Sequence, residues 1–212
     1  SHEYRDGSTH HLKSVQGGLK IQRRPGGKLH IENYRQCPSQ YRSYTIATLQ
    51  CRNDELSTPT AWDVESKVAR SAAAPAYLYS GSRQRAVVEG GTFTLQTGKD
   101  RRSHEVNGKV TCKWCLFDAV QRLPRLGTPR VEFTLLDEYD ELCPNQVLSL
   151  RGQGKVRTKA GEIEVTAFQH TGIATVPGVF YVDANGRLLV YLAGMQLLVL
   201  TSADGKPTEY MK

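Results

Sequence analysis

The segment from Gly178 to Leu200 constrains the fold most strongly, because short apolar stretches alternate there with turn residues. Its sequence, GVFYVDANGRLLVYLAGMQLLVL, is interrupted at Asn185-Gly186 and again at Gly194. Asn-Gly favours the two-residue turn of a β-hairpin, and apolar residues at alternate positions beside such a turn are typical of strands. The segment therefore predicts three consecutive strands joined by tight turns.

Strand and turn signals of this kind cover most of the 212 residues. Further strands are predicted within the ranges 19–34, 41–51, 60–69, 85–98, 131–135 and 146–172. No regular alternation of strands with long helices is present, which argues against a parallel sheet with crossover helices. We expect a mainly β fold with a curved antiparallel sheet that is barrel-like or a β-spiral. It is expected to form one domain over residues 1–212, with residues 1–11 flexible.

One short helix is predicted between residues 112 and 123. Thr111 is expected to be its N-cap, with the hydroxyl accepting a hydrogen bond from a backbone N–H of the first turn. Apolar residues then recur at helical spacing, at Leu116, Ala119, Val120 and Leu123. Pro124 is expected to end the helix. This stripe predicts that one face of the helix, with Cys112 and Cys115, packs against the body of the protein.

Cys112 and Cys115 form a C-x-x-C pair at the start of this helix. A thiolate at a helix N-terminus is stabilised, and a second thiol one turn later can close a disulfide, as in thioredoxin-like oxidoreductases. The residues before Cys112 are too polar for the buried central strand of that fold. A thiol-disulfide oxidoreductase is therefore an alternative function and not the preferred one.

A zinc site would need four ligands, and Cys112, Cys115 and Cys143 with a histidine, His104 or His170, would supply them. The second C-x-x-C pair of a typical zinc site is absent, so no metal and no cofactor are expected. The preferred interpretation is a structural disulfide, and because the number of cysteines is odd, one thiol is left over. The spacing leaves the pairing open among Cys37, Cys51, Cys112, Cys115 and Cys143.

The chain carries 28 Lys and Arg against 21 Asp and Glu, a net charge of +7. These basic residues are scattered through turns, without a basic helix and without the aromatic neighbours that single-strand binders use. Scattered charge solvates a surface, so nucleic acid is not an expected partner. A basic surface module that binds an acidic polymer is the second alternative. No apolar run is long enough to span a membrane.

Two stretches carry a resemblance to a known group of proteins. The first is WDVES at 62–66, and the second contains Tyr181, Asp183, Gly186, Arg187 and Leu188. With the β-rich order of the chain, they resemble uncharacterised secreted or periplasmic bacterial β-sheet domains related to β-spiral envelope-integrity proteins. The resemblance implies export, a curved antiparallel sheet and no known catalysis.

We therefore expect an exported, non-enzymatic β domain that binds an apolar ligand or a cell-envelope component, or that has a structural role. The predicted ligand groove is lined by Trp62, Val64, Tyr181 and Tyr191 on a curved sheet. The expected location is periplasmic or secreted, although the 212 residues contain no signal-peptide pattern.

Overall fold

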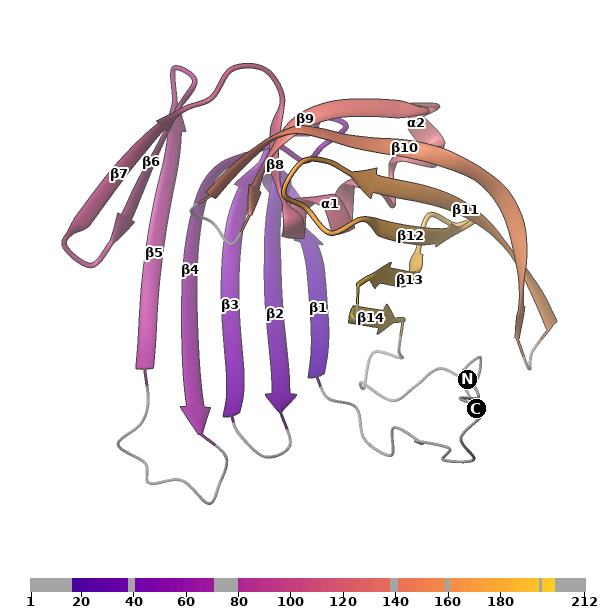
Figure 1. Cartoon of the computed structure of the whole chain (residues 1–212), viewed down its shortest axis with the longest axis horizontal. Helices are drawn as coiled ribbons and strands as arrows, with labels where there is room; N and C mark the ends of the chain where they lie inside the picture. Colours follow the sequence, from indigo (N-terminus) through magenta and orange to yellow (C-terminus); the bar gives the residue numbers. More distant parts are fainter. Residues whose placement is uncertain are drawn as a thin grey trace.

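The described part of the chain folds into two open β-sheets that pack around a short helix (Figure 1). The structure, a computed structural model, describes residues 17–37, 41–70, 80–137, 141–158, 161–194 and 196–200. The predicted flexible segment 1–11 lies outside these residues. The prediction of a mainly β, largely antiparallel fold is confirmed.

Sheet A is a meander of seven described strands, each paired antiparallel with the next. Its strands are β1 (Gly17–Arg24), β2 (Lys28–Cys37), β3 (Tyr41–Cys51), β4 (Pro59–Arg70), β5 (Ser80–Glu89), β6 (Thr92–Thr97) and β7 (Asp100–Glu105). A 3-10 turn with the sequence Pro-Gly-Gly, η1 (Pro25–Gly27), joins β1 to β2. The order of the strands in the sheet is therefore their order in the sequence, because tight turns place consecutive strands side by side.

Sheet B has the order β14-β13-β12-β11-β10-β9-β8 in the described residues. Its strands are β8 (Val110–Cys112), β9 (Arg130–Asp137), β10 (Glu141–Thr158), β11 (Gly161–Thr171), β12 (Gly178–Asp183), β13 (Leu188–Ala193) and β14 (Gln196–Val199). All pairs are antiparallel except β8 with β9, which is parallel because α1 (Lys113–Ala119) and α2 (Leu123–Leu126) cross between them. Both sheets keep two edge strands, so the described strands do not close into a barrel.

The Asn185-Gly186 turn joins β12 to β13, which confirms the three predicted strands. The Asp183 carboxylate accepts the backbone N–H groups of Asn185 and Arg187, at 3.0 and 2.7 Å. Gly186 has a φ of 80°, and a Cβ there would lie 2.7 Å from the Gln121 carbonyl oxygen. Only glycine satisfies both the left-handed conformation and this close approach.

The start of α1 differs from the prediction. Cys112, and not Thr111, is the N-cap residue, and no side chain caps the first turn. Thr111 belongs to β8, where its buried hydroxyl donates to the Leu56 carbonyl oxygen at 2.8 Å. A buried hydroxyl must find a partner where it lies, and the loop between β3 and β4 supplies one. The predicted Thr111 cap is therefore wrong.

The predicted helix over 112–123 is also divided in two. Helix α1 ends at Ala119, and a turn leads into α2 at Leu123. Pro124 lies in the first turn of α2 and does not end a helix. The first turn of a helix tolerates proline because its N–H groups have no intrahelical partner. The predicted apolar stripe is nevertheless buried, at Leu116, Ala119, Val120 and Leu123.

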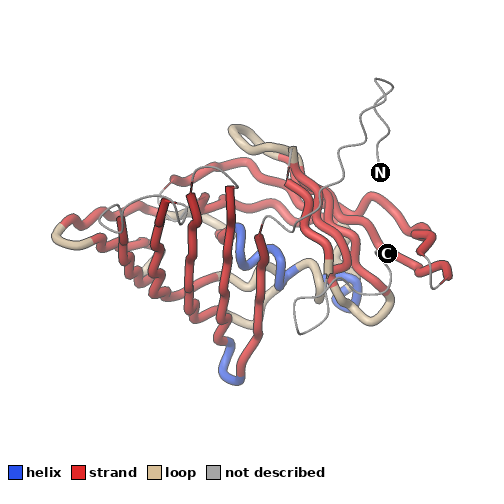
Figure 2. Tube along the Cα trace, turned by 90° about the horizontal axis from the view of Figure 1, so that it is seen from below, coloured by secondary structure: helices blue, strands red, loops and turns tan. Residues whose placement is uncertain are grey.

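Helix α1 lies between the two sheets (Figure 2). On one side Cys115 packs into a cluster with Leu49 and Trp62 of sheet A, here called the sheet A cluster. On the other side Phe117 packs into a cluster with Phe180 and other side chains of sheet B, here called the sheet B cluster. The helix therefore gives the two sheets a common core.

A buried histidine stands at one end of the sheet B cluster. His170 on β11 stacks on Phe133, with ring centroids 5.5 Å apart, and its Nε2 lies 3.0 Å from the Gln146 side-chain oxygen. Gln146 is fully buried and donates to the carbonyl oxygens of Pro144 and Ile173, both at 2.9 Å. Burial, with a smaller contribution from Lys113, lowers the pKa of His170 to about 4.

This low pKa predicts that His170 makes the protein less stable in mild acid. An unfolded histidine, with a pKa of about 6.5, takes up a proton as the pH falls below that value, whereas folded His170 stays neutral until about pH 4. The contribution to the free energy of unfolding is therefore constant above pH 7 and falls by about 2 kcal/mol by pH 5. Urea unfolding of the wild type and of His170→Gln at both pH values checks this, since the wild type should lose about 2 kcal/mol more. Equal losses in the two proteins would contradict it.

Candidate functional site

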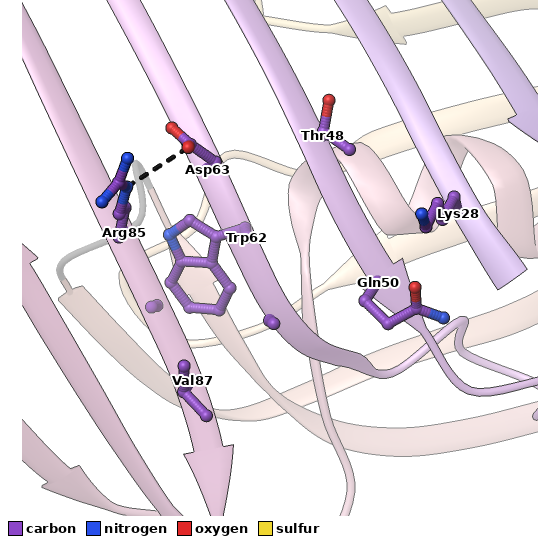
Figure 3. Close-up of a pocket in the computed structure, with 9 residues that line it drawn as sticks. Lys28, Thr48, Gln50, Trp62, Asp63, Arg85 and Val87 are labelled. Atoms are coloured by element: carbon purple, nitrogen blue, oxygen red, sulfur yellow. Dashed lines mark hydrogen bonds and ion pairs between the residues drawn. The ribbon is translucent and has the colours of Figure 1, made fainter.

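A shallow hollow lies on one face of sheet A, across strands β2 to β5 (Figure 3). Its volume is about 310 Å³, and it is lined by Lys28, Thr48, Gln50, Ala61, Trp62, Asp63, Arg85, Ala86 and Val87. Successive side chains of a strand point to opposite faces. The side chains of Gln50, Ala61 and Asp63 therefore point away from those of Leu49 and Trp62, which are buried in the sheet A cluster. The hollow opens on the outer face of sheet A, the face turned away from α1.

The pairing register explains why the hollow forms over Ala61. Ala61 on β4 lies between Gln50 on β3 and Val87 on β5. In the next row, Asp63 lies between Thr48 and Arg85. Cross-strand neighbours have Cβ atoms only about 5 Å apart, so a methyl group among longer side chains leaves a depression. The floor of the hollow is therefore apolar and its rim is polar.

The rim carries more positive than negative charge. Asp63 accepts two hydrogen bonds from Arg83, at 2.8 and 2.6 Å, and one of 3.3 Å from Arg85. The hydrogen bonds from Arg83 hold the pKa of Asp63 below its usual value, so this carboxylate is ionised at neutral pH. Lys28 lies on the other side of the hollow from Arg85 (Figure 3). The hollow is therefore lined by two cations, Lys28 and Arg85, and one carboxylate, which favours an anionic ligand over a cationic one.

The structure does not gather the four predicted groove residues into one groove. Trp62 and Val64 are buried in the sheet A cluster, where the Trp62 ring lies 5.3 Å from that of Phe93. The Trp62 indole N–H donates to the Gln84 side-chain oxygen at 3.0 Å. Of the four, Trp62 also borders the hollow.

Tyr181 and Tyr191 face opposite sides of sheet B. Tyr191 is buried in the sheet B cluster and pairs with Phe180. Tyr181, the next residue after Phe180, pairs with Val190 and is half-buried on the other face. Because successive side chains of a strand point to opposite faces, the side chains of Phe180 and Tyr181 must lie on different sides of sheet B.

Aromatic side chains of α1 and sheet B pack together between the two sheets. The Phe117 ring of α1 contacts the rings of Phe180 and Tyr191 edge-on, with centroid distances of 5.6 and 4.9 Å. Phe180 and Tyr191 in turn lie 4.6 Å apart. Edge-on arrangements at these distances are favourable. An apolar ligand at this position would have to displace α1.

Three of the cysteines meet beside the sheet A cluster. The Cys115 sulfur lies 3.3 Å from that of Cys112 and 3.7 Å from that of Cys51. All three are free thiols, and all three are buried, so the predicted inward direction of Cys112 and Cys115 is confirmed. Burial, more than the neighbouring thiols, raises the pKa of Cys115 well above its ordinary value.

The remaining cysteines lie apart from this group. Cys143 is a buried free thiol in the sheet B cluster, and burial also raises its pKa. Cys37 ends β2, paired with Tyr41, and its predicted disulfide is still a prediction. In the described part of the chain, no group of three or more His, Cys, Asp or Glu side chains is arranged to hold a metal ion. The described helices are too short and too polar for any of them to cross a membrane.

Of the residues that line the hollow, Trp62 was predicted from the sequence as a groove residue, and the others were not. The available signal was indirect, because Ala61 and Asp63 flank Trp62 and must lie on the face opposite a buried tryptophan. Lys28 belongs to a basic turn that was interpreted as a solvated surface. The neighbours of Ala61 come from β3 and β5, and only the register of the sheet shows that they are adjacent.

No known family model matches the chain, and no curated protein sequence matches it. A search of solved structures found similarity to one described as a beta-barrel-like protein of a domain of unknown function, DUF1849, from Brucella abortus. The TM-score is 0.49 and the sequence identity 11%, and the similarity covers 82% of each chain.

Proposed function

We propose that this protein is an exported, non-enzymatic β domain that binds a ligand through the outer face of sheet A. The observation that carries the proposal is the hollow over Ala61, with its apolar floor and its cations at Lys28 and Arg85. The ligand that fits this chemistry has a carboxylate or phosphate group next to a small apolar surface. The acidic amphiphiles of a cell envelope belong to this class.

The position of the thiols supports a non-enzymatic role. A thiol-disulfide oxidoreductase needs a thiolate that is exposed enough to attack a substrate and that has a lowered pKa. Cys115 has no exposed surface and a raised pKa, and Cys112 is 1% exposed. Neither cysteine is exposed enough to attack a substrate, and the pKa of Cys115 is raised, so the oxidoreductase alternative is not favoured.

Export is proposed on the resemblance carried by residues 62–66 and 181–188. It is tested separately from binding, by fractionating cells that produce the protein from its natural gene. Recovery with the periplasm or the medium supports export. Recovery with the cytosol would refute export without affecting the proposed binding face.

Ligand binding is tested with hexyl phosphate, and with hexanol as an uncharged control. We expect hexyl phosphate to perturb the backbone NMR signals around Thr48, Ala61 and Arg85, and hexanol to perturb them much less. Lys28→Ala should weaken the binding of hexyl phosphate about tenfold, since a hydrogen bond to a charged group contributes about 1.5 to 3 kcal/mol.

Ala61→Leu is expected to abolish this binding, because the larger side chain fills the floor of the hollow without changing any charge. The matched control is Ala167→Leu on β11, which adds the same atoms to a half-buried position of sheet B. Ala167→Leu should bind as the wild type does. Equal binding by Ala61→Leu and the wild type, or signals that move only around α1, would overturn the proposed face.

A further inference from the structure

The three buried thiols connect parts of the molecule that are far apart in the sequence. Cys51 ends β3 of sheet A, whereas Cys112 ends β8 of sheet B and Cys115 lies in the first turn of α1. The Cys115 sulfur contacts both of the others, at 3.3 and 3.7 Å. A sulfur in contact with two others can form a disulfide with either, after small movements of the side chains.

We propose that this group is a disulfide site in which Cys115 is the shared sulfur, and that the bond from Cys115 to Cys51 locks α1 onto sheet A. The inference is independent of the proposed ligand-binding face. The two bonds that Cys115 can form have very different consequences, because they close loops of very different length.

A bond between Cys112 and Cys115 closes a loop of four residues within one turn and constrains little else. A bond between Cys51 and Cys115 links positions 64 residues apart and joins sheet A to α1. In the chain-entropy description, a disulfide stabilises by restricting the unfolded chain, and a longer loop is restricted more. The bond to Cys51 should therefore raise the melting temperature much more than the bond to Cys112.

The oxidation needs a small disulfide as oxidant, such as oxidised glutathione. The Cys115 and Cys51 thiols each lose a proton and an electron, and one sulfur–sulfur bond forms between them. The glutathione disulfide breaks, and its two sulfurs take up these electrons and protons as two thiols. The exchange passes through a mixed disulfide with one glutathione.

The three thiols are buried in the folded protein, and this determines at which stage the oxidation can occur. The three cysteine residues are between 0 and 5% exposed, and thiol–disulfide exchange requires an accessible thiolate. Oxidised glutathione should therefore react slowly with the folded protein and much faster while the chain folds. The bond is expected to form during folding and then to resist reduction.

The test is refolding of the full chain with oxidised glutathione, followed by peptide mapping and thermal unfolding. Among the three grouped thiols, Cys112→Ser leaves only the bond from Cys115 to Cys51, and the melting temperature of this variant should rise by about 10 °C on oxidation. Among the same thiols, Cys51→Ser leaves only the bond from Cys115 to Cys112, and its melting temperature should rise by about 5 °C. Cys115→Ser should show no disulfide in this region and no rise.

Cys143→Ser is the matched control, because this buried thiol lies in the sheet B cluster, away from the site. Its melting temperature should rise on oxidation as much as that of the wild type. A disulfide between Cys51 and Cys112 in Cys115→Ser would overturn the shared role of Cys115. Equal rises in Cys112→Ser and Cys51→Ser, or no disulfide after oxidative refolding, would overturn the proposed lock.

Discussion

Replacing Asp118 with alanine is expected to lower the free energy of unfolding by about 3 kcal/mol, because it removes the centre of a buried ion-pair cluster. Asp118 is 6% exposed and lies on α1. Arg23 on β1 donates to both of its carboxylate oxygens, at 3.2 and 2.9 Å. The Ser57 hydroxyl also donates to it, and Arg122 forms an ion pair with it at 3.4 Å.

These contacts attach α1 to sheet A and to the loop between β3 and β4. Without Asp118, Arg23 and Arg122 would face each other with no anion between them. Removing one partner of a buried ion pair costs more free energy than the pair itself contributes, because the other charge is left buried and unpaired. Both arginines retain some exposure, with side chains 28% and 23% exposed, so solvent relieves part of the cost. This places the expected loss near the lower end of the usual range of about 3 to 5 kcal/mol.

Asp63→Ala is the control, because Asp63 also pairs with two arginines but lies on the surface. Its side chain is 37% exposed, and exposed ion pairs contribute less than about 1 kcal/mol. Urea unfolding of the two variants at neutral pH measures the difference. A similar loss in both proteins would show that the Asp118 cluster does not hold α1 in place.

The hairpins of this fold were predictable because their causes are local. The Pro-Gly-Gly turn and the Asn185-Gly186 turn each determine the pairing of the strands beside them. The face on which a side chain lies follows from alternation along the strand, which is why Trp62 and Val64 are buried on the same face of β4.

Features that depend on contacts between distant segments were not predictable. Thr111 had the right chemistry for a cap, but the Leu56 carbonyl, 55 residues away, is its actual partner. The contact between Cys51 and Cys115 joins sheet A to α1 across 64 residues of sequence, and no local pattern indicates it. The ion pair of Asp118 with Arg122 could have been predicted, because Arg122 follows Asp118 at the spacing of one helical turn.

Which segment packs between the two sheets was not predicted from the sequence. A curved sheet with inward aromatic residues suggested a groove for an apolar ligand, and it suggests an apolar core equally well. The sequence contains the occupant of that space, because Phe117 belongs to the short helix that inserts between the sheets. Whether the concave face of a sheet is covered by a helix of the same chain or is left open for a ligand depends on packing in three dimensions, and the sequence pattern does not decide it.

Phe117→Ala is expected to lower the free energy of unfolding by about 4 kcal/mol, because truncating a fully buried phenylalanine removes its apolar contacts and leaves a cavity. Phe117 is 1% exposed, and its ring contacts the rings of Phe180 and Tyr191. Phe117→Leu keeps most of the volume and should cost less than half as much. Urea unfolding measures both losses, and the leucine variant keeps the comparison informative if the alanine variant does not fold.

The same pair of variants distinguishes a filled core from a ligand chamber. An apolar cavity made by truncation can bind a small apolar molecule such as benzene, so benzene should raise the melting temperature of Phe117→Ala by several degrees. The wild type and Phe117→Leu have no space for benzene between Phe180 and Tyr191, and their melting temperatures should not rise. A comparable rise in the wild type would mean that α1 moves aside to admit apolar ligands. The interior, and not the outer face of sheet A, would then be the binding site.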